Sequence, residues 1–122
     1  FVNVSILWDY FRFYGPEQKL NDIIHDAFRA HCFHQMLPLD LVGKLSNLGY
    51  KNIQSENLSY LITNRDENSP AIYYEKMLAK FAISQGISEN KVIDWQNQLN
   101  DSEKAKKFGF TSFPVLTSAY LP

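Results

Sequence analysis

The sequence predicts an α/β fold whose elements follow one another as β-α-α-β-α-α-β. Three observations predict it. A nearly continuous apolar run opens the chain at Phe1–Trp8, two later segments are rich in β-forming residues, and the stretches between them repeat apolar residues at helical spacing. Strands that alternate with helical segments favour a sheet covered by helices. We therefore expect three strands and about four helices in the 122 residues.

The first strand is expected at Phe1–Trp8, where only Asn3 and Ser5 interrupt the apolar residues. Strands buried on both faces have this composition, whereas half-exposed strands alternate. No earlier strand is available to pair with it, so the sheet is expected to be half of a larger one. The absence of an initiator methionine before Phe1 likewise suggests that the chain is cut from something longer.

Two helices are expected next. The first begins at Pro16, a favoured first helical residue, and the second opens at Pro38 and ends at Gly49. One face of the first helix carries residues spaced by three and four positions: Leu20, Ile23, Ile24, Ala27, Phe28 and His31.

A second strand is expected at Tyr50–Asn64, where apolar and polar residues partly alternate, followed by a charged surface loop at 65–68. A helix then begins after Ser69-Pro70 and ends at Gly86, and Ser88 caps another. The first of these helices shows apolar residues at helical spacing: Tyr74, Met77, Leu78, Phe81 and Ala82.

The last strand is expected at Phe110–Leu121, with Pro114 at its start, at an edge or at a bulge because proline has no N–H to donate.

Composition excludes several classes of protein. The formal net charge of −1 gives no attraction to nucleic acid or anionic lipid, and no apolar run is long enough to span a membrane. The single cysteine, Cys32, cannot form an intramolecular disulfide, so a reducing compartment and a cytoplasmic location are expected.

Three histidines, His25, His31 and His34, lie near Cys32. Their spacing does not bring a metal-binding set onto one helix face, so a structural or surface role is favoured over a metal site or a polar ligand contact. Cys32 is expected to be a small, partly buried residue rather than a nucleophile.

Aromatic residues gather directly after the first strand, around Asp9. Ligand sites in open α/β sheets lie beyond the carboxyl ends of strands, so this cluster could form a pocket wall, with a hydrophobic lid as the equal alternative. Its members are Trp8, Tyr10, Phe11, Phe13 and Tyr14.

Several short motifs occur in a characteristic order: Trp8-Asp9, Ala30-His31-Cys32, Leu37-Pro38, Leu48-Gly49-Tyr50, Trp95-x-x-x-Leu99 and the closing Phe110-Thr111-Ser112-Phe113-Pro114. In this order they resemble the C-terminal half of a class I S-adenosylmethionine-dependent methyltransferase of the "methyltransferase domain 11/25" kind. The chain departs from that family at Ile6 and Leu7, where members often have acidic residues.

The resemblance implies a Rossmann-like parent sheet, of which this chain would hold the fifth, the sixth and the antiparallel seventh strands. The chain would then be a single partial domain, residues 1–122, with the helix pair as an insertion at about 69–107. S-adenosylmethionine would be the cofactor, but its glycine loop and acidic ribose-binding residue would lie in the N-terminal half, so no cofactor-binding residue is expected here. The acceptor side would be lined by Trp8, Asp9, Tyr10, Phe11, His31 and Phe113. Any catalytic base would come from Asp9 or His31, and neither is assigned.

Three hypotheses about function follow. The first is the substrate-lining portion of a methyltransferase acting on a small molecule, inactive without the N-terminal half. The second is a non-catalytic α/β interaction module that assembles with a second copy or another chain by strand pairing. The third is a free-standing small-molecule carrier that uses the aromatic cluster and requires a closed apolar cavity.

Overall fold

The computed structural model describes all residues, 1–122, as a mixed α/β chain with four helices and two three-stranded antiparallel sheets. The chain divides into two compact units. The first, here called the sheet unit, comprises Phe1–Phe11, His34–Tyr60 and Thr111–Pro122. The second, the helix unit, comprises Arg12–Phe33 and Leu61–Phe110.

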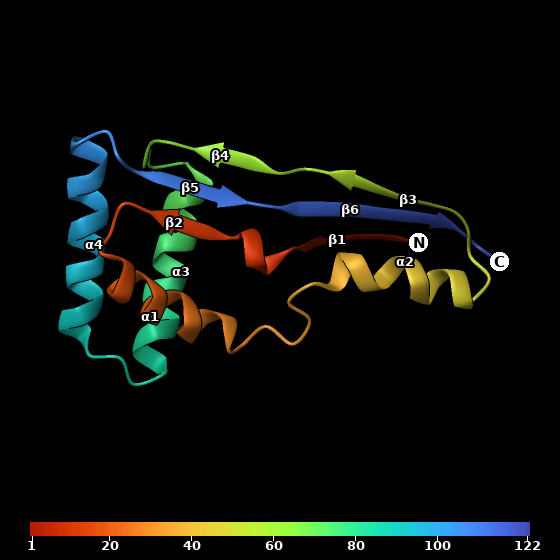
Figure 1. Cartoon of the computed structure of the whole chain (residues 1–122), viewed down its shortest axis with the longest axis horizontal. Coiled ribbons are helices and arrows are strands. Elements are labelled where there is room, and N and C mark those ends of the chain that lie inside the picture. The colour runs from red at the N-terminus through yellow and green to blue at the C-terminus, as the bar shows by residue number, and fades with distance from the viewer. The chain divides into compact units, whose positions relative to one another are not determined.

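The sheet unit is built on β6 (Pro114–Tyr120), which lies between β1 (Val2–Ile6) and β3 (Lys51–Asn57). Strand β6 runs antiparallel to both neighbours, so β1 and β3 run parallel to each other. The helix α2 (Leu37–Asn47) packs against this sheet (Figure 1). The last strand is therefore antiparallel to its neighbours, the direction that the resemblance implied for it.

The prediction that the first strand is buried on both faces is wrong for β1. It is an edge strand that pairs with β6 alone, and the side chains of Val2 and Val4 are 75% and 59% exposed. The side chains alternate, and the polar atoms of Asn3 and Ser5 are the buried ones. The apolar run therefore places its valines on the uncovered face, because a strand's side chains point alternately to its two faces.

The helix unit packs α1 (Gln18–Arg29), α3 (Pro70–Ser84) and α4 (Glu89–Lys104) against one another (Figure 1). A second sheet of three short strands belongs largely to this unit, in the order β2 (Arg12–Tyr14), β5 (Gly109–Ser112) and β4 (Tyr60–Ile62). The core consists of side chains with almost no exposed surface, among them Phe13, Ile24, Leu78, Trp95, Leu99 and Phe110.

Three strands were expected and six are present. The predicted strand at 50–64 is β3 and β4, separated where the Ser59 N–H donates to Oδ1 of Asn57 over 2.7 Å in a side-chain-stabilised turn. The predicted strand at 110–121 is β5 and β6, with Pro114 at the start of β6. The short strand β2 was not predicted, because three residues carry too little periodicity.

Most helix ends lie where the sequence places them. Ser69 Oγ accepts the Ala71 N–H over 3.1 Å, Ser88 caps α4, and Gly86 follows α3 with a φ of 87°. The first helix begins at Gln18 rather than at Pro16, because Glu17 has a non-helical backbone (φ −50°, ψ 132°) and is the N-cap. The Glu17 N–H donates to the Gln98 side chain over 2.8 Å. No helix is long and apolar enough to cross a lipid bilayer.

Candidate functional site

The carboxyl end of β1 turns sharply through a 3₁₀ helix, η1 (Trp8–Tyr10). Two backbone hydrogen bonds fix the turn. The Leu7 N–H donates to the Phe113 carbonyl over 3.0 Å, and the Trp8 N–H donates to the Gln35 carbonyl over 2.9 Å. The turn is thus held to the segments that precede β6 and α2.

An aromatic shelf, consisting of Trp8, Tyr10, Phe11 and Phe113, lies at this turn. The rings of Trp8 and Phe11 meet edge to face with centroids 4.9 Å apart, and those of Tyr10 and Phe113 are 5.6 Å apart. Phe11 is buried, whereas Tyr10 is 57% exposed, so the shelf has an anchored side and an open side. Asp9 is exposed within the same turn. Five of the six residues expected at the acceptor side therefore share one region of the sheet unit.

A hollow of about 220 Å³ lies at the same end of the sheet and shares Phe113 with the shelf. It is lined by residues from the carboxyl ends of β1 and β3, the start of β6 and the first turn of α2: Leu7, Pro38, Leu39, Ser55, Glu56, Asn57, Phe113 and Val115. Pockets for drug-sized ligands are about 300–1,000 Å³, so this hollow accommodates only part of such a molecule. With the shelf it offers an apolar surface suited to an aromatic or aliphatic group.

His31, the sixth expected residue, belongs to the helix unit. It is exposed in the turn after α1, and its ring lies 4.6 Å from that of Phe81. In this position His31 packs on α3. Its expected role toward an acceptor stays a prediction.

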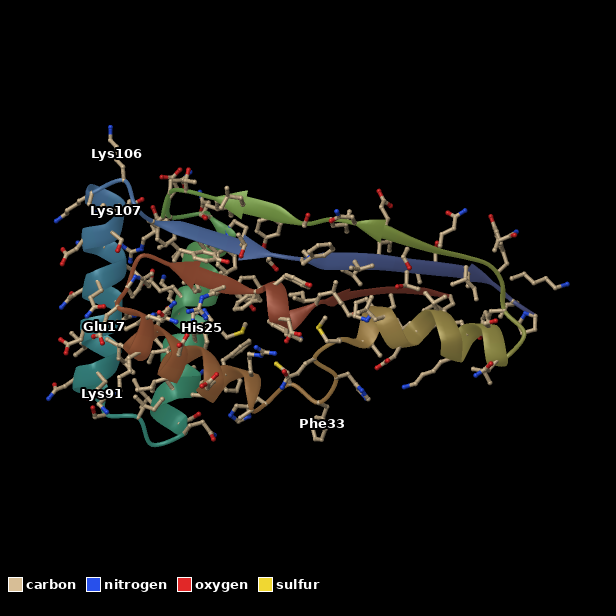
Figure 2. The ribbon with its side chains drawn as sticks, viewed as in Figure 1. Glu17, His25, Phe33, Lys91, Lys106 and Lys107 are labelled. Carbon is tan, nitrogen blue, oxygen red and sulfur yellow. The ribbon has the colours of Figure 1, made fainter.

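The other histidines and Cys32 fit the structural or surface role that the sequence favoured. His25 is buried, and burial lowers its pKa to about 4 (Figure 2). His34 is exposed. Cys32 is partly buried, and this burial raises the pKa of its thiol, which disfavours the nucleophilic thiolate. No group of three or more His, Cys, Asp or Glu residues is placed to hold a metal ion.

The expected surface loop at 65–68 begins with a residue that is mostly buried. The Arg65 guanidinium donates to both carboxylate oxygens of Glu75, each over 2.9 Å, and the Arg65 N–H donates to Glu103. The side chains of Arg65 and Glu75 are only 12% and 8% exposed. Burial raises the pKa of the Glu75 carboxyl and the Arg65 hydrogen bonds oppose this. The pair joins the segment after β4 to α3.

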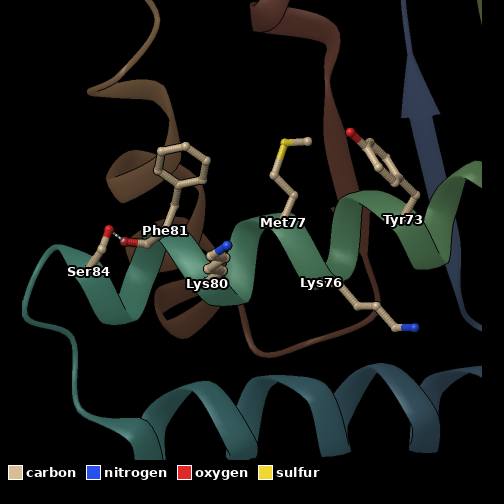
Figure 3. Close-up of a pocket in the computed structure, with 6 residues that line it drawn as sticks. All are labelled: Tyr73, Lys76, Met77, Lys80, Phe81 and Ser84. Carbon is tan, nitrogen blue, oxygen red and sulfur yellow. Dashed lines mark hydrogen bonds between the residues drawn. The ribbon is translucent and has the colours of Figure 1, made fainter.

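One surface of the helix unit was not predicted from the sequence. A hollow of about 650 Å³ lies along α3 (Figure 3) and is lined by Tyr73, Lys76, Met77, Lys80, Phe81 and Ser84. Met77 and Phe81 share the helical spacing of Leu78 and Ala82, yet they line the hollow, while Leu78 and Ala82, with Ala71, are fully buried. The available signal was the spacing of Tyr73, Met77 and Phe81, which lie four residues apart.

No protein-family model matches the chain, and no curated protein matches it either.

Proposed function

We propose that this chain is the acceptor-side half of an S-adenosylmethionine-dependent methyltransferase that acts on a small molecule. Its role is to present the acceptor, while the cofactor is held by a half that precedes it. The observation that carries the proposal is the arrangement of the sheet unit, where β1 and β3 run parallel on either side of the antiparallel β6.

Strand direction supports the proposal. The resemblance implies two successive strands of one direction and a final antiparallel strand, and β1, β3 and β6 have these directions. Parallel strands need long crossover connections, and the connection from β1 to β3 contains α1 and α2.

The position of the aromatic shelf supports it as well. The Trp8-Asp9 pair, on which the resemblance begins, lies directly after β1, and the closing motif brings Phe113 to the same place. A shelf beyond the carboxyl end of a strand is where open α/β sheets bind their ligands. Trp8, Tyr10 and Phe113 would hold an apolar acceptor, and Asp9 would orient a polar group on it.

The outer edge of β1 is a third support. Phe1 exchanges two backbone hydrogen bonds with Ala119 of β6, and the Leu7 N–H donates to the carbonyl of Phe113, just before β6. Since every second residue of an antiparallel strand bonds to the same neighbour, Asn3 and Ser5 also bond to β6. The N–H and C=O groups of Val2, Val4 and Ile6 therefore point away from β6. These groups can pair with one further strand. The exposed side chains of Val2 and Val4 provide apolar surface for whatever covers that face.

The residues of this chain do not by themselves form a binding site for S-adenosylmethionine. The glycines stand far apart in the sequence, at 15, 43, 49, 86 and 109, and form no glycine-rich loop after a strand. Cofactor binding is therefore assigned to the preceding half, and this chain contributes alignment of the acceptor, which can supply a large part of the rate enhancement.

Calorimetry with S-adenosylmethionine tests the proposal on two proteins, the 122-residue chain and the product of the complete reading frame that contains it. The complete product should bind the cofactor and the 122-residue chain should not. A glycine-rich strand–loop–helix is expected roughly a hundred residues before Phe1. Tight binding by the 122-residue chain alone, or a reading frame without such a loop, would contradict the proposal.

The free edge of β1 also favours a second candidate, a non-catalytic interaction module that assembles by strand pairing. Light scattering would then show a dimer of the 122-residue chain. Val4→Lys on the edge strand should dissociate it, whereas Val42→Lys, at an exposed position of α2, should not. A monomer at high concentration contradicts this candidate. The carrier hypothesis lacks such support, because the shelf borders only the small hollow described above.

A further inference from the structure

Helix α3 presents a row of three large side chains that its own unit covers only in part: Tyr73 is exposed, and Met77 and Phe81 are partly exposed. Tyr73, Met77 and Phe81 are spaced four residues apart and point to the same side of the helix in Figure 3. They line the hollow of about 650 Å³, whose walls come from α3 alone. Rows of this spacing are the ridges with which one helix packs into the groove of another.

The row is held in place before any partner arrives. The Phe81 ring lies 5.4 Å from that of Phe28 and 4.6 Å from that of His31, both contributed by α1 and the turn after it. The Tyr73 ring packs edge to face on Tyr74 at 5.2 Å. Restrained aromatic side chains lose little conformational entropy on binding, which makes them effective anchors.

Positive charge lies beside this row. Lys76 and Lys80 line the same hollow, both are exposed, and neither forms a salt bridge. Glu75, the neighbour of Lys76 in sequence, is buried and forms its ion pair with Arg65. No acidic residue lines the hollow.

We propose that this face of α3 docks an amphipathic helix of a partner protein whose apolar row is flanked by Glu or Asp. The apolar row of the partner would pack against Tyr73, Met77 and Phe81, and its carboxylates would face Lys76 and Lys80. Residues 73 to 81 span about 12 Å along a helix axis at 1.5 Å per residue, so a short helix of three turns covers the row. The proposal does not depend on methyltransferase function.

Charge also argues against other occupants. A second copy that used the same face about a two-fold axis would bring lysine rows together, which is repulsive. An anionic membrane is disfavoured because the chain has a net charge of −1 and the face offers two lysines only, fewer than interfacial helices use.

Two designed helical peptides test the proposal with the full chain. Both carry leucines at every fourth position, one with flanking glutamates and the other with flanking lysines in their place. Fluorescence polarisation should show the glutamate peptide binding at least about tenfold more tightly, since opposite charges across an interface discriminate partners. Lys76→Glu with Lys80→Glu should reverse that preference.

The matched control is Lys91→Glu with Lys106→Glu, two exposed positions at the ends of the α4 region (Figure 2) that change the net charge equally. This variant should keep the preference for the glutamate peptide. Tyr73→Ser should weaken binding while leaving the thermal unfolding midpoint close to that of the parent, because Tyr73 is 61% exposed. Equal affinity for both peptides, no binding of either, or stronger binding to anionic phosphatidylglycerol vesicles overturns the proposal.

Discussion

The backbone N–H of Phe13 donates a hydrogen bond to Nε2 of the His25 ring over 3.1 Å. The other ring nitrogen, Nδ1, lies 2.7 Å from the Asn21 carbonyl oxygen and donates to it, so the ring is neutral with its proton on Nδ1. Asn21 in turn donates to the Phe13 carbonyl over 2.8 Å and accepts from Nε1 of Trp95 over 2.9 Å. This buried network joins β2, α1 and α4.

Acid should destabilise the helix unit through His25. Its pKa is about 4 in the folded chain against an ordinary 6.5, chiefly because of burial, so the unfolded state binds the proton first. The His25 contribution is complete above pH 6.5 and is lost as the pH falls toward 4, at about 1.4 kcal/mol per pH unit or roughly 3 kcal/mol in all. Urea unfolding followed by Trp95 fluorescence in a Trp8→Phe background measures it. His31→Gln, at an exposed histidine, should retain this slope, and a stability that does not change between pH 7 and pH 4.5 would contradict the assignment.

Replacing only one partner of the buried Arg65–Glu75 pair should lower the stability of the protein. Arg65→Met leaves the Glu75 carboxylate buried without its partner, and we expect a loss of about 3 kcal/mol in the free energy of unfolding. Arg65→Met with Glu75→Met should recover most of that loss, because no buried charge is left. Chemical denaturation of the single and double variants tests this, and equal stability of all of them would show that the pair is not buried in solution.

Gly15 and Gly43 form a matched pair of glycine positions. Gly15 has a φ of +128°, and a Cβ there would lie 2.5 Å from Cβ and Oγ of Ser102, so Gly15→Ala should cost roughly 2 kcal/mol of stability. Gly43 lies within α2 with nothing near its Cβ position, so Gly43→Ala should stabilise by about 0.5–1 kcal/mol. Thermal unfolding measures both changes, and the same sign for the two would contradict the described backbone.

Hydrogen exchange should alternate along β1. The amides of Asn3 and Ser5 bond to β6 and should be protected, whereas those of Val4 and Ile6 face the free edge and should exchange rapidly in the monomer. Exchange measured residue by residue by NMR checks this. Protection of Val4 and Ile6 in a dilute monomer would mean that the edge is covered.

Local chemistry made part of the fold predictable. Ser69 and Ser88 cap their helices through their own hydroxyls, and Gly86 ends α3 in the left-handed conformation that glycine adopts without strain. The aromatic part of the candidate site was predictable for a similar reason, since Trp8, Asp9, Tyr10 and Phe11 follow one strand in sequence. Only Phe113 had to be brought to them by pairing of distant strands.

The predictions from sequence were wrong where the outcome depends on which residues are buried. Val2 and Val4 are apolar, yet they lie on an uncovered face, and Met77 and Phe81 line an open hollow although their spacing matched a buried stripe. The sequence indicates that Arg65 is an exposed loop residue, but its guanidinium is mostly buried because it donates to the carboxylate of Glu75, ten positions away. Hydrophobic pattern reports which residues can be buried and not which of them find a partner surface.

The sequence by itself determined the helices with their caps and the presence of strands at the start and the end of the chain. It also determined the aromatic turn after the first strand. These features depend on neighbours within a few residues. Only the tertiary structure decided that β6 lies between β1 and β3, that His25 is enclosed by Phe13 and Asn21, and that one face of α3 stays open. Those features depend on contacts between residues far apart in the chain, and no local preference encodes which distant surface a strand or helix will meet.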